Sequence, residues 1–336
     1  MAKLAGVSHQ TVSRVLNDAA HVRPETRNRV LHAMEMLEYR PNAVARALVT
    51  GRSRTLGVVS FDTTLYGPAS TLLGIERAAH AQGYYVAIVS MTSLDRASLV
   101  DALGRLNRQG VDGILVIAPL VEAVQALATL RSDVPVVALE AGPDDAVPVV
   151  AVDQEGGARA ATEHLLALGH RTVHHLAGPA SFLESTQRER GWRAALDAAG
   201  AAAPAPLVGD WSAASGYALA QRLLADHDPT AIFVANDQMA LGVLRALHEA
   251  GRSLPGDVSV VGFDDIPEAA YFLPPLTTVR QDFSEMGERA LHLMLEQLAG
   301  GAVARTRVEI EPQLVVRSSC APPRPGADHR PSRRLP

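Results

Sequence analysis

Cysteine is nearly absent from the 336-residue sequence, and the single one, Cys320, lies in a proline-rich segment near the C-terminus. One thiol can form neither a disulfide within the chain nor a cysteine-cluster metal site. The sequence also has no apolar run approaching the roughly 18 residues that a membrane span needs, and no signal peptide at its start. We therefore expect a cytoplasmic protein with no membrane partner.

Motifs for cofactors and catalysis are also missing. The residues that follow the first expected strand, 61–66 (F-D-T-T-L-Y), contain no G-x-G-x-x-G phosphate fingerprint. No P-loop, H-E-x-x-H or G-x-S-x-G motif occurs, and the histidines are scattered without a metal-ligand spacing. We expect no cofactor, no metal and no catalytic residues, and thus a protein that is not an enzyme.

Lysine is represented by Lys3 alone, and charge is distributed unevenly along the chain. Residues 1–54 carry nine Lys and Arg against four Asp and Glu, a net charge of +5, so the remaining residues carry −10. A basic head on an acidic body indicates a chain that contacts phosphate at one end only.

The length of the chain exceeds one ordinary domain, and the 47% hydrophobic content is enough to fill sizeable cores.

The most informative stretch is 5–17, A-G-V-S-H-Q-T-V-S-R-V-L-N. Gly6 allows a sharp turn, Ser8 stands where a helix N-cap belongs, and Val12 and Val15 then share one helical face. The opposite face carries the polar residues His9, Gln10, Ser13, Arg14 and Asn17. Because Gln and Arg pair bidentately with adenine and guanine edges, this pattern predicts a helix-turn-helix, the alternative being an ordinary surface helix.

The flanking residues complete a small helical head. Residues 1–4 are typical of the end of a first helix whose beginning is missing, since no N-cap precedes them. We expect a third helix over 21–39, with a proline in its first turn and an apolar stripe of Val30, Met34 and Leu37.

A second distinctive segment, 39–48, reads Y-R-P-N-A-V-A-R-A-L. Pro41 ends the preceding helix, and 43–48 is a helix too short to be stable alone. It is followed by the basic linker 50–54. The short helix is either a simple connector or a segment that folds only when docked on DNA.

From Thr55 onward, strand and helix patterns alternate, which predicts parallel, doubly wound α/β structure. The expected strands are 56–61, 85–90, 113–117, 134–139, 149–152, 172–176, 231–235 and 258–263. The expected helices are 73–81, 98–109, 157–168, 190–199, 215–225 and 238–250. These strand–helix units are too many for one compact sheet. We therefore expect two Rossmann-like subdomains, with a ligand in the crevice at the carboxyl ends of the strands.

Together, the 5–17 stretch, the 39–48 segment and the two-lobed body resemble the LacI/GalR family of sugar-responsive bacterial transcription regulators. Further matching motifs are G-D-W-S-A (209–213), V-A-N-D-Q-M-A-L-G (234–242), V-S-V-V-G-F-D-D (258–265) and P-P-L-T-T-V-R-Q-D-F (274–283). The resemblance runs from Met1 to about Ser318. It implies a body of the periplasmic-binding-protein type.

The same resemblance implies the division of the chain. It comprises a helix-turn-helix head (1–40, its first helix truncated), a hinge helix and linker (41–54), a two-lobed effector-binding and dimerisation core (55–318) and a disordered tail (319–336). The N-lobe would hold about 55–151 and 283–309, and the C-lobe about 152–280 and 310–318. Because the tail lacks apolar heptads, a coiled-coil tetramer is unsupported and a homodimer is expected.

For DNA, the resemblance implies that His9, Gln10 and Arg14 read bases of an operator, in keeping with a division between base readout and backbone positioning. The residues implied to hold mainly phosphates are Ser8, Thr11, Ser13, Asn17 and His21. The hinge-helix residues implied to contact DNA are Asn42, Ala45, Arg46 and Leu48. Leu48 would wedge into the minor groove of a near-palindromic site bound by a dimer and kink the duplex.

For the effector, the resemblance implies that Trp211 is the platform for a sugar ring. The implied polar clamp consists of Arg188, Asn236 and Asp264, and the implied further lining of Leu65, Gly67, Pro68, Ile117, Glu140, Gln281 and Phe283. Glu140 stands where the family pattern has Asp, and Ile117 where it has Asn. The effector, a galactoside, glucoside or similar sugar, therefore need not be of the lactose type.

Two other functions compete with a ligand-released repressor. One is a sugar-binding protein with no role on DNA, which would have no use for a basic head. The other is a carbohydrate enzyme, since Glu140, Asp264 and Asp265 supply carboxylates near the crevice.

Overall fold

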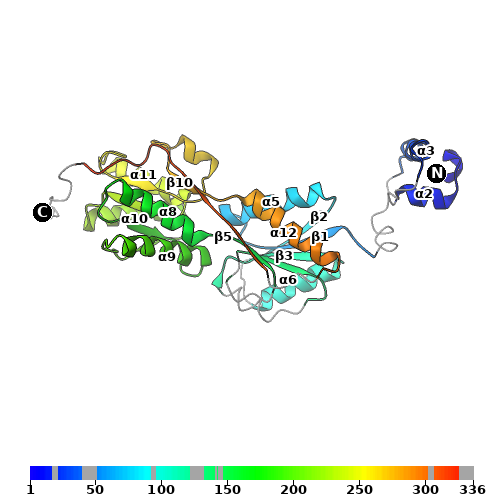
Figure 1. Ribbon diagram of the computed structural model, residues 1–336, viewed down its shortest axis with the longest axis horizontal. Coiled ribbons are helices and arrows are strands. Elements are labelled where there is room, and N and C mark those ends of the chain that lie inside the picture. Colours follow the sequence, from blue (N-terminus) through cyan, green and yellow to red (C-terminus); the bar gives the residue numbers. More distant parts are fainter. Residues whose placement is uncertain are drawn as a thin grey trace. The chain divides into compact units, whose positions relative to one another are not determined.

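The computed structural model describes residues 1–16, 22–39, 51–91, 96–121, 132–140, 142, 147–301 and 306–324. The chain divides into two compact units, Met1–Arg54 and Thr55–Pro336, and Figure 1 shows their elements. The division follows Arg54, where the sequence predicts that the basic linker ends.

In the part of the first unit that the structure describes, the helices are α1 (Ala2–Ala5), α2 (His9–Leu16) and α3 (Pro24–Met36). Its small core consists of Ala2, Ala5, Val12, Val15, Val30 and Ala33. Gly6 ends α1 in the left-handed conformation, with φ of 63°, and the Ser8 hydroxyl accepts a hydrogen bond from the Thr11 amide at 3.1 Å. The turn and N-cap therefore form at the residues that the sequence indicates.

One detail of the head differs from expectation. Leu37 is 51% exposed, and Ala33 rather than Leu37 joins Val30 in the core. The physical reason is that α3 ends at Met36, so Leu37 is no longer on the helical stripe. The predicted DNA contacts Asn17, His21, Asn42, Ala45, Arg46 and Leu48 lie outside the described residues.

The second unit contains two lobes, each built on a parallel sheet. The N-lobe sheet has the order β11-β5-β4-β3-β1-β2. Its strands are β1 (Thr55–Phe61), β2 (Tyr85–Met91), β3 (Gly113–Ile117), β4 (Val136–Leu139), β5 (Val149–Val152) and β11 (Arg307–Ile310). Its helices are α5 (Tyr66–Ala81), α6 (Arg96–Arg108) and α12 (Phe283–Leu298).

Alternating side chains of the inner strands build the two faces of this sheet. In β3, Leu115 and Ile117 pack toward α5 and α12, while Ile114 and Val116 pack with α6. The sheet is therefore covered on both faces, as Figure 1 shows. This is why β3 reads as an unbroken apolar run rather than as an alternation.

The C-lobe sheet has the order β7-β6-β8-β9 and is also parallel. Its strands are β6 (His174–Ala177), β7 (Leu207–Val208), β8 (Ala231–Val234) and β9 (Ser259–Val261). Its helices are α8 (Gln154–Ala167), α9 (Leu183–Ala198), α10 (Ala213–Asp226), α11 (Asp237–Glu249) and the 3-10 turn η1 (Pro267–Tyr271). Ala231 and Phe233 pack with α8 and α9, whereas Ile232 and Val234 pack with α10 and α11.

The chain crosses between the lobes three times. The first crossing follows β5, and the other two run beside β10 (Thr278–Arg280) and β12 (Gln313–Val315), which pair antiparallel. The second crossing leads into α12, which packs closely on α5 through Gly74 and Gly287. Neither glycine has room for a Cβ, because each lies against the backbone of the facing helix.

The C-terminal segment corrects one prediction. Residues 319–324, expected within a disordered tail, are ordered against the C-lobe: the buried Ser319 hydroxyl donates to the Val260 carbonyl at 2.6 Å and accepts from the Thr277 amide at 2.8 Å. Arg324 also pairs with Asp257 at 2.6 Å. The segment is short and proline-rich, and it is held by backbone and hydroxyl hydrogen bonds and by the packing of Cys320 on the C-lobe core. Residues 325–336 lie outside the described residues.

Candidate ligand-binding and DNA-binding sites

The first candidate site is the polar face of α2. His9, Gln10, Ser13 and Arg14 are exposed, while Val12 and Val15 on the opposite face are buried. Ser8 and Thr11 are tied to each other, since their hydroxyls lie 2.9 Å apart and the Ser8 oxygen also caps the helix. The helix thus presents a row of hydrogen-bonding side chains from a fixed N-terminal turn.

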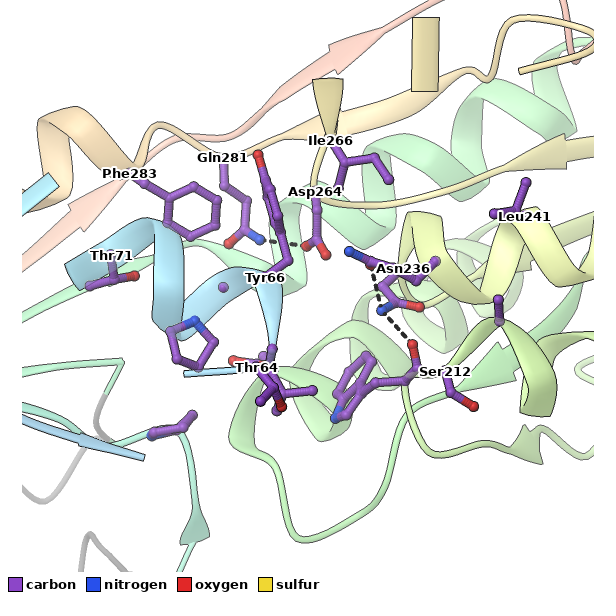
Figure 2. Close-up of a pocket in the computed structure, with 18 of the residues that line it drawn as sticks. Thr64, Tyr66, Thr71, Ser212, Asn236, Leu241, Asp264, Ile266, Gln281 and Phe283 are labelled. Atoms are coloured by element: carbon purple, nitrogen blue, oxygen red, sulfur yellow. Dashed lines mark hydrogen bonds between the residues drawn. The ribbon is translucent and has the colours of Figure 1, made fainter. Parts of the chain in front are cut away.

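The second candidate site is a cavity of about 720 Å³ between the two lobes of the second unit. All eleven residues that the sequence assigns to effector binding line it. They are Leu65, Gly67, Pro68, Ile117, Glu140, Arg188, Trp211, Asn236, Asp264, Gln281 and Phe283. Figure 2 shows part of this lining. The structure brings them into one place, and their binding of a ligand stays a prediction.

Topology explains why residues far apart in sequence meet here. Ile117 ends β3, Glu140 follows β4, and Asn236 and Asp264 follow β8 and β9. The carboxyl ends of parallel strands meet at one edge of a sheet, and the two lobes turn these edges toward each other. A cavity at this position is the default ligand site of doubly wound folds.

Arg188, from α9, is the centre of the polar wall. Its Nε donates to Gln154 Oε1 at 2.9 Å, its NH1 donates to the Ala235 carbonyl, and its NH2 lies 3.5 Å from Asp264 Oδ1. The guanidinium carbon also lies 3.8 Å from the centre of the Phe263 ring. The side chain is therefore held in one position before any ligand arrives.

Gln281 closes this arrangement into a ring. Its Nε2 donates to Asp264 Oδ1 at 2.7 Å, an interaction drawn in Figure 2, and its Oε1 accepts from Gln154 Nε2 at 2.8 Å. Four buried side chains, Arg188, Gln154, Gln281 and Asp264, thus satisfy one another in a cycle. Because Gln281 leads from a crossover strand into α12, the cycle joins the C-lobe to the entry of the N-lobe helix.

Asn236 lines the cavity, but its side chain is bonded within the C-lobe and takes no part in the cycle around Arg188. Its Oδ1 caps α11 by accepting from the Met239 amide at 3.0 Å, and its Nδ2 donates to the Trp211 carbonyl at 3.1 Å and to Gln238 Oε1 at 2.9 Å. Both amide hydrogens are therefore occupied within the protein. In the structure Asn236 fixes the loop that carries Trp211.

Trp211 is 7% exposed and has a left-handed backbone, with φ of 73°. Its ring meets Phe182 edge to face at 5.6 Å, and its indole Nε1 has no hydrogen-bond partner among the described residues. Glu140 and Asp264 also have positive φ, at 56° and 106°. Non-glycine residues in this region carry backbone strain, and three of them at one cavity indicate a functional site.

Three carboxyl groups of the cavity have raised pKa values. Burial raises the pKa of Glu140 to about 8, and the nearby Glu184 carboxylate adds to this. Burial likewise raises the pKa of Glu184 to about 7 and that of Asp264 to about 6, although the charge of Arg188 opposes both shifts. The site is thus one in which proton occupancy changes near neutral pH.

Sequence reasoning missed several lining residues. Glu184 precedes Arg188 by one helical turn on α9, so the i, i+4 spacing was the available signal. Tyr66 packs edge to face on Phe283, with ring centres 5.8 Å apart. Figure 2 shows both side chains in the lining. In the sequence Tyr66 lies between Leu65 and Gly67, which were predicted to line the cavity. The remaining members, such as Phe272, carry no local signal.

Two negative observations concern the described residues alone. No helix among them is both long and apolar enough to cross a membrane. Among the same residues, no three His, Cys, Asp or Glu side chains are grouped to hold a metal ion.

Comparison with known proteins finds matches to both units of the chain. Residues 1–42 match the model of bacterial regulatory proteins of the lacI family, and residues 162–320 match a periplasmic binding protein-like domain. The chain is 37% identical over 308 residues to the lactose operon repressor of Escherichia coli (strain K12), which covers 90% of this chain and 85% of that protein.

A second relative and a solved structure are similar over nearly the whole chain. The HTH-type transcriptional repressor PurR of Mannheimia succiniciproducens is 35% identical over 325 residues, covering 95% of this chain and 97% of the relative. The crystal structure of the lac repressor dimer bound to operator and the anti-inducer ONPF aligns with a TM-score of 0.84 and 35% identity, over 95% of this chain and 97% of that one. The chain therefore belongs to the lacI family of bacterial regulatory proteins.

Proposed function

We propose that the protein is a repressor that binds a near-palindromic operator as a homodimer and is released when a sugar binds between its lobes. One observation carries this proposal. A helix-turn-helix with an exposed polar face and a preformed cavity lined by strand ends occur in the same chain. The lac repressor is bound to operator and to a small ligand in the structure that this chain resembles.

On DNA, α2 is the recognition helix in this proposal. His9, Gln10 and Arg14 are exposed and can reach base edges, whereas Ser8 and Thr11 lie at the first turn, where amides and hydroxyls suit phosphate oxygens. A homodimer matches the two-fold symmetry of a palindromic operator. DNA binding also places the protein in the cytoplasm in this proposal.

Exposed apolar side chains support the dimer. Tyr271 and Leu273 of the C-lobe are 85% and 90% exposed, and Tyr85 and Ile88 lie exposed on the edge strand β2. Large apolar residues and an open strand edge at the surface are features that a subunit interface would cover.

In the cavity, a sugar suits the combination of groups present. The Trp211 ring offers an apolar surface to the C–H face of a pyranose, and Arg188 and Asp264 offer charged hydrogen-bonding groups to its hydroxyls. Release of DNA then requires only that the ligand binds two arrangements of the lobes with different affinity. A coupling of about 1–3 kcal/mol changes DNA affinity about five- to 150-fold.

The test uses the full chain and an operator selected from random-sequence DNA. Fluorescence anisotropy measures the bound fraction while galactosides, glucosides and neutral or amino monosaccharides are added, and calorimetry measures their binding in parallel. The expected result is a selected near-palindrome whose bound fraction falls as a sugar fills the cavity. Sugar binding without any selected DNA would support a plain sugar-binding protein, and turnover of a glycoside would support an enzyme; either overturns the proposal.

A further inference from the structure

The charge balance of the cavity is unusual for a site that binds neutral sugars. Among the described residues that line it, the carboxyl groups are those of Glu140, Glu184, Asp210, Asp264 and Glu268, and the only cation is Arg188. Asp210 and Glu268 are exposed or at the rim, whereas Glu140, Glu184 and Asp264 surround Arg188 in the interior. The interior thus holds three acids and one base.

Arg188 is already bonded within the protein through three of its five N–H groups, and one of the three partners is an acid. It pairs with Asp264, and its other nitrogens donate to Gln154 and to the Ala235 carbonyl. The Gln281 amide supplies a further bond to Asp264. Asp264 is therefore the acid whose carboxylate is paired within the protein, by Arg188 and Gln281. Glu140 and Glu184 are the interior acids that remain for a ligand.

Glu140 and Glu184 approach each other from opposite lobes. Glu140 follows β4 of the N-lobe, and Glu184 lies in the first turn of α9 in the C-lobe. Both side chains line the same cavity, and the charge of Glu184 raises the pKa of Glu140. The other charges that face them are Arg188, which acts on both, Arg307, which acts on Glu140, and Asp264, which acts on Glu184.

We propose that the effector presents a protonated amine to Glu140 and Glu184, as an amino sugar does. A cation bound beside both carboxyls favours their ionised forms and joins the lobes through charge-assisted hydrogen bonds. This proposal rests on the proposed function of the cavity, and it names the ligand class for that site.

A second observation is the aromatic surface beside these acids. The Trp211 ring belongs to the cavity lining, and the guanidinium carbon of Arg188 lies 5.7 Å from its centre. The apolar C–H face of a pyranose packs on such a ring. An amino sugar therefore offers a cation to the two glutamates and an apolar face to the indole in one molecule.

Proton release gives a direct readout. With pKa values of about 8 and about 7, Glu140 is largely protonated and Glu184 about half protonated at pH 7 in the free protein. A bound ammonium group drives them to ionise, so binding transfers about one proton from the carboxyls to the buffer. A neutral sugar at the same position leaves the protons where they are.

The experiment is calorimetry on the full chain at pH 7 in two buffers of different ionisation enthalpy. The probes are galactosamine and glucosamine, their N-acetyl derivatives, and galactose and glucose. We expect an amino sugar to bind at least tenfold more tightly than its acetylated and neutral counterparts, with about one proton released. Glu184→Gln and Glu140→Gln each weaken amine binding about ten- to hundredfold and abolish proton release.

The matched control is Glu189→Gln, which removes an exposed carboxylate of the same helix that pairs with Arg193 outside the cavity. It leaves amine binding unchanged. Equal or tighter binding of galactose or glucose, or amine binding without proton release, overturns the amine assignment. If the amine assignment fails but a neutral sugar releases operator DNA, the proposed function stands. If no saccharide of any kind alters DNA binding, the proposed function itself is overturned, and the amine assignment with it.

Discussion

The Arg188→Met variant tests how the cavity wall is stabilised. Methionine keeps a long apolar stem but removes the guanidinium that faces Asp264, Glu140 and Glu184. Because that charge lowers the pKa of all three carboxyls, the variant raises each of these pKa values further. The loss of stability therefore depends on whether the carboxyls are ionised.

The magnitude follows from Asp264. In the folded wild type its pKa is about 6, against an ordinary value of 3.8, so its burial reduces stability progressively as pH rises from about 4 to 6. In the variant the reduction continues above pH 6. At pH 8, two pH units above the wild-type pKa, the extra loss reaches up to about 2–3 kcal/mol, since one unit corresponds to about 1.4 kcal/mol.

At pH 5 this electrostatic loss vanishes, because Asp264 is largely protonated in both folded proteins. What remains there is the loss of the bonds from Arg188 to Gln154 and to the Ala235 carbonyl, about 1–3 kcal/mol. We thus expect the variant to be destabilised at both pH values, and by about 2 kcal/mol more at pH 8.

Urea unfolding followed by tryptophan fluorescence measures this directly, since both tryptophans, Trp192 and Trp211, lie in the C-lobe. The control is Arg222→Met, which removes an exposed ion pair to Asp226 at 3.9 Å in the same lobe. It changes stability by less than about 1 kcal/mol, and equally at both pH values. An Arg188→Met loss that is the same at pH 5 and pH 8 would refute the reasoning.

Other predictions concern the two sites and the core. Trp211→Ala abolishes the sugar response and retains operator binding, measured by anisotropy; unchanged sugar affinity would remove Trp211 from the site. Arg14→Ala relaxes base preference at one operator position in a selection experiment, whereas a uniform loss across all sequences would assign Arg14 to phosphate contact. Leu48→Ala weakens operator binding and reduces the DNA bend in circular-permutation gels, and an unaltered bend would reject the minor-groove wedge. Gly287→Ala, whose Cβ meets the Gly74 backbone, lowers the free energy of unfolding by about 1–3 kcal/mol, measured by urea unfolding. Gly104→Ala, whose Cβ meets only a flexible arginine side chain, raises it slightly. Equal effects of the two substitutions would show that the α5–α12 contact can relax.

The sequence by itself determined the local elements and their order. The stretch around Gly6 and Ser8 predicts a turn and a capped helix because both are properties of neighbouring residues. Buried strands such as β3 and β8 are visible as short apolar runs, and parallel topology then places their carboxyl ends at one edge. The resemblance to the family named the individual residues Ile117, Glu140 and Asp264, and all three line the cavity at these strand ends.

Only the tertiary structure decided how these residues act on one another. The cycle through Gln154 and Gln281 joins side chains 127 residues apart, and no periodicity reports such a pairing. The tail around Ser319 is ordered by hydrogen bonds to the distant Val260 and Thr277. The local sequence of this proline-rich segment contains no pattern from which those partners could be predicted. The raised pKa values of Glu140 and Glu184 likewise arise only once the two lobes bring these side chains into one cavity, because a pKa depends on surroundings that the chain assembles by folding.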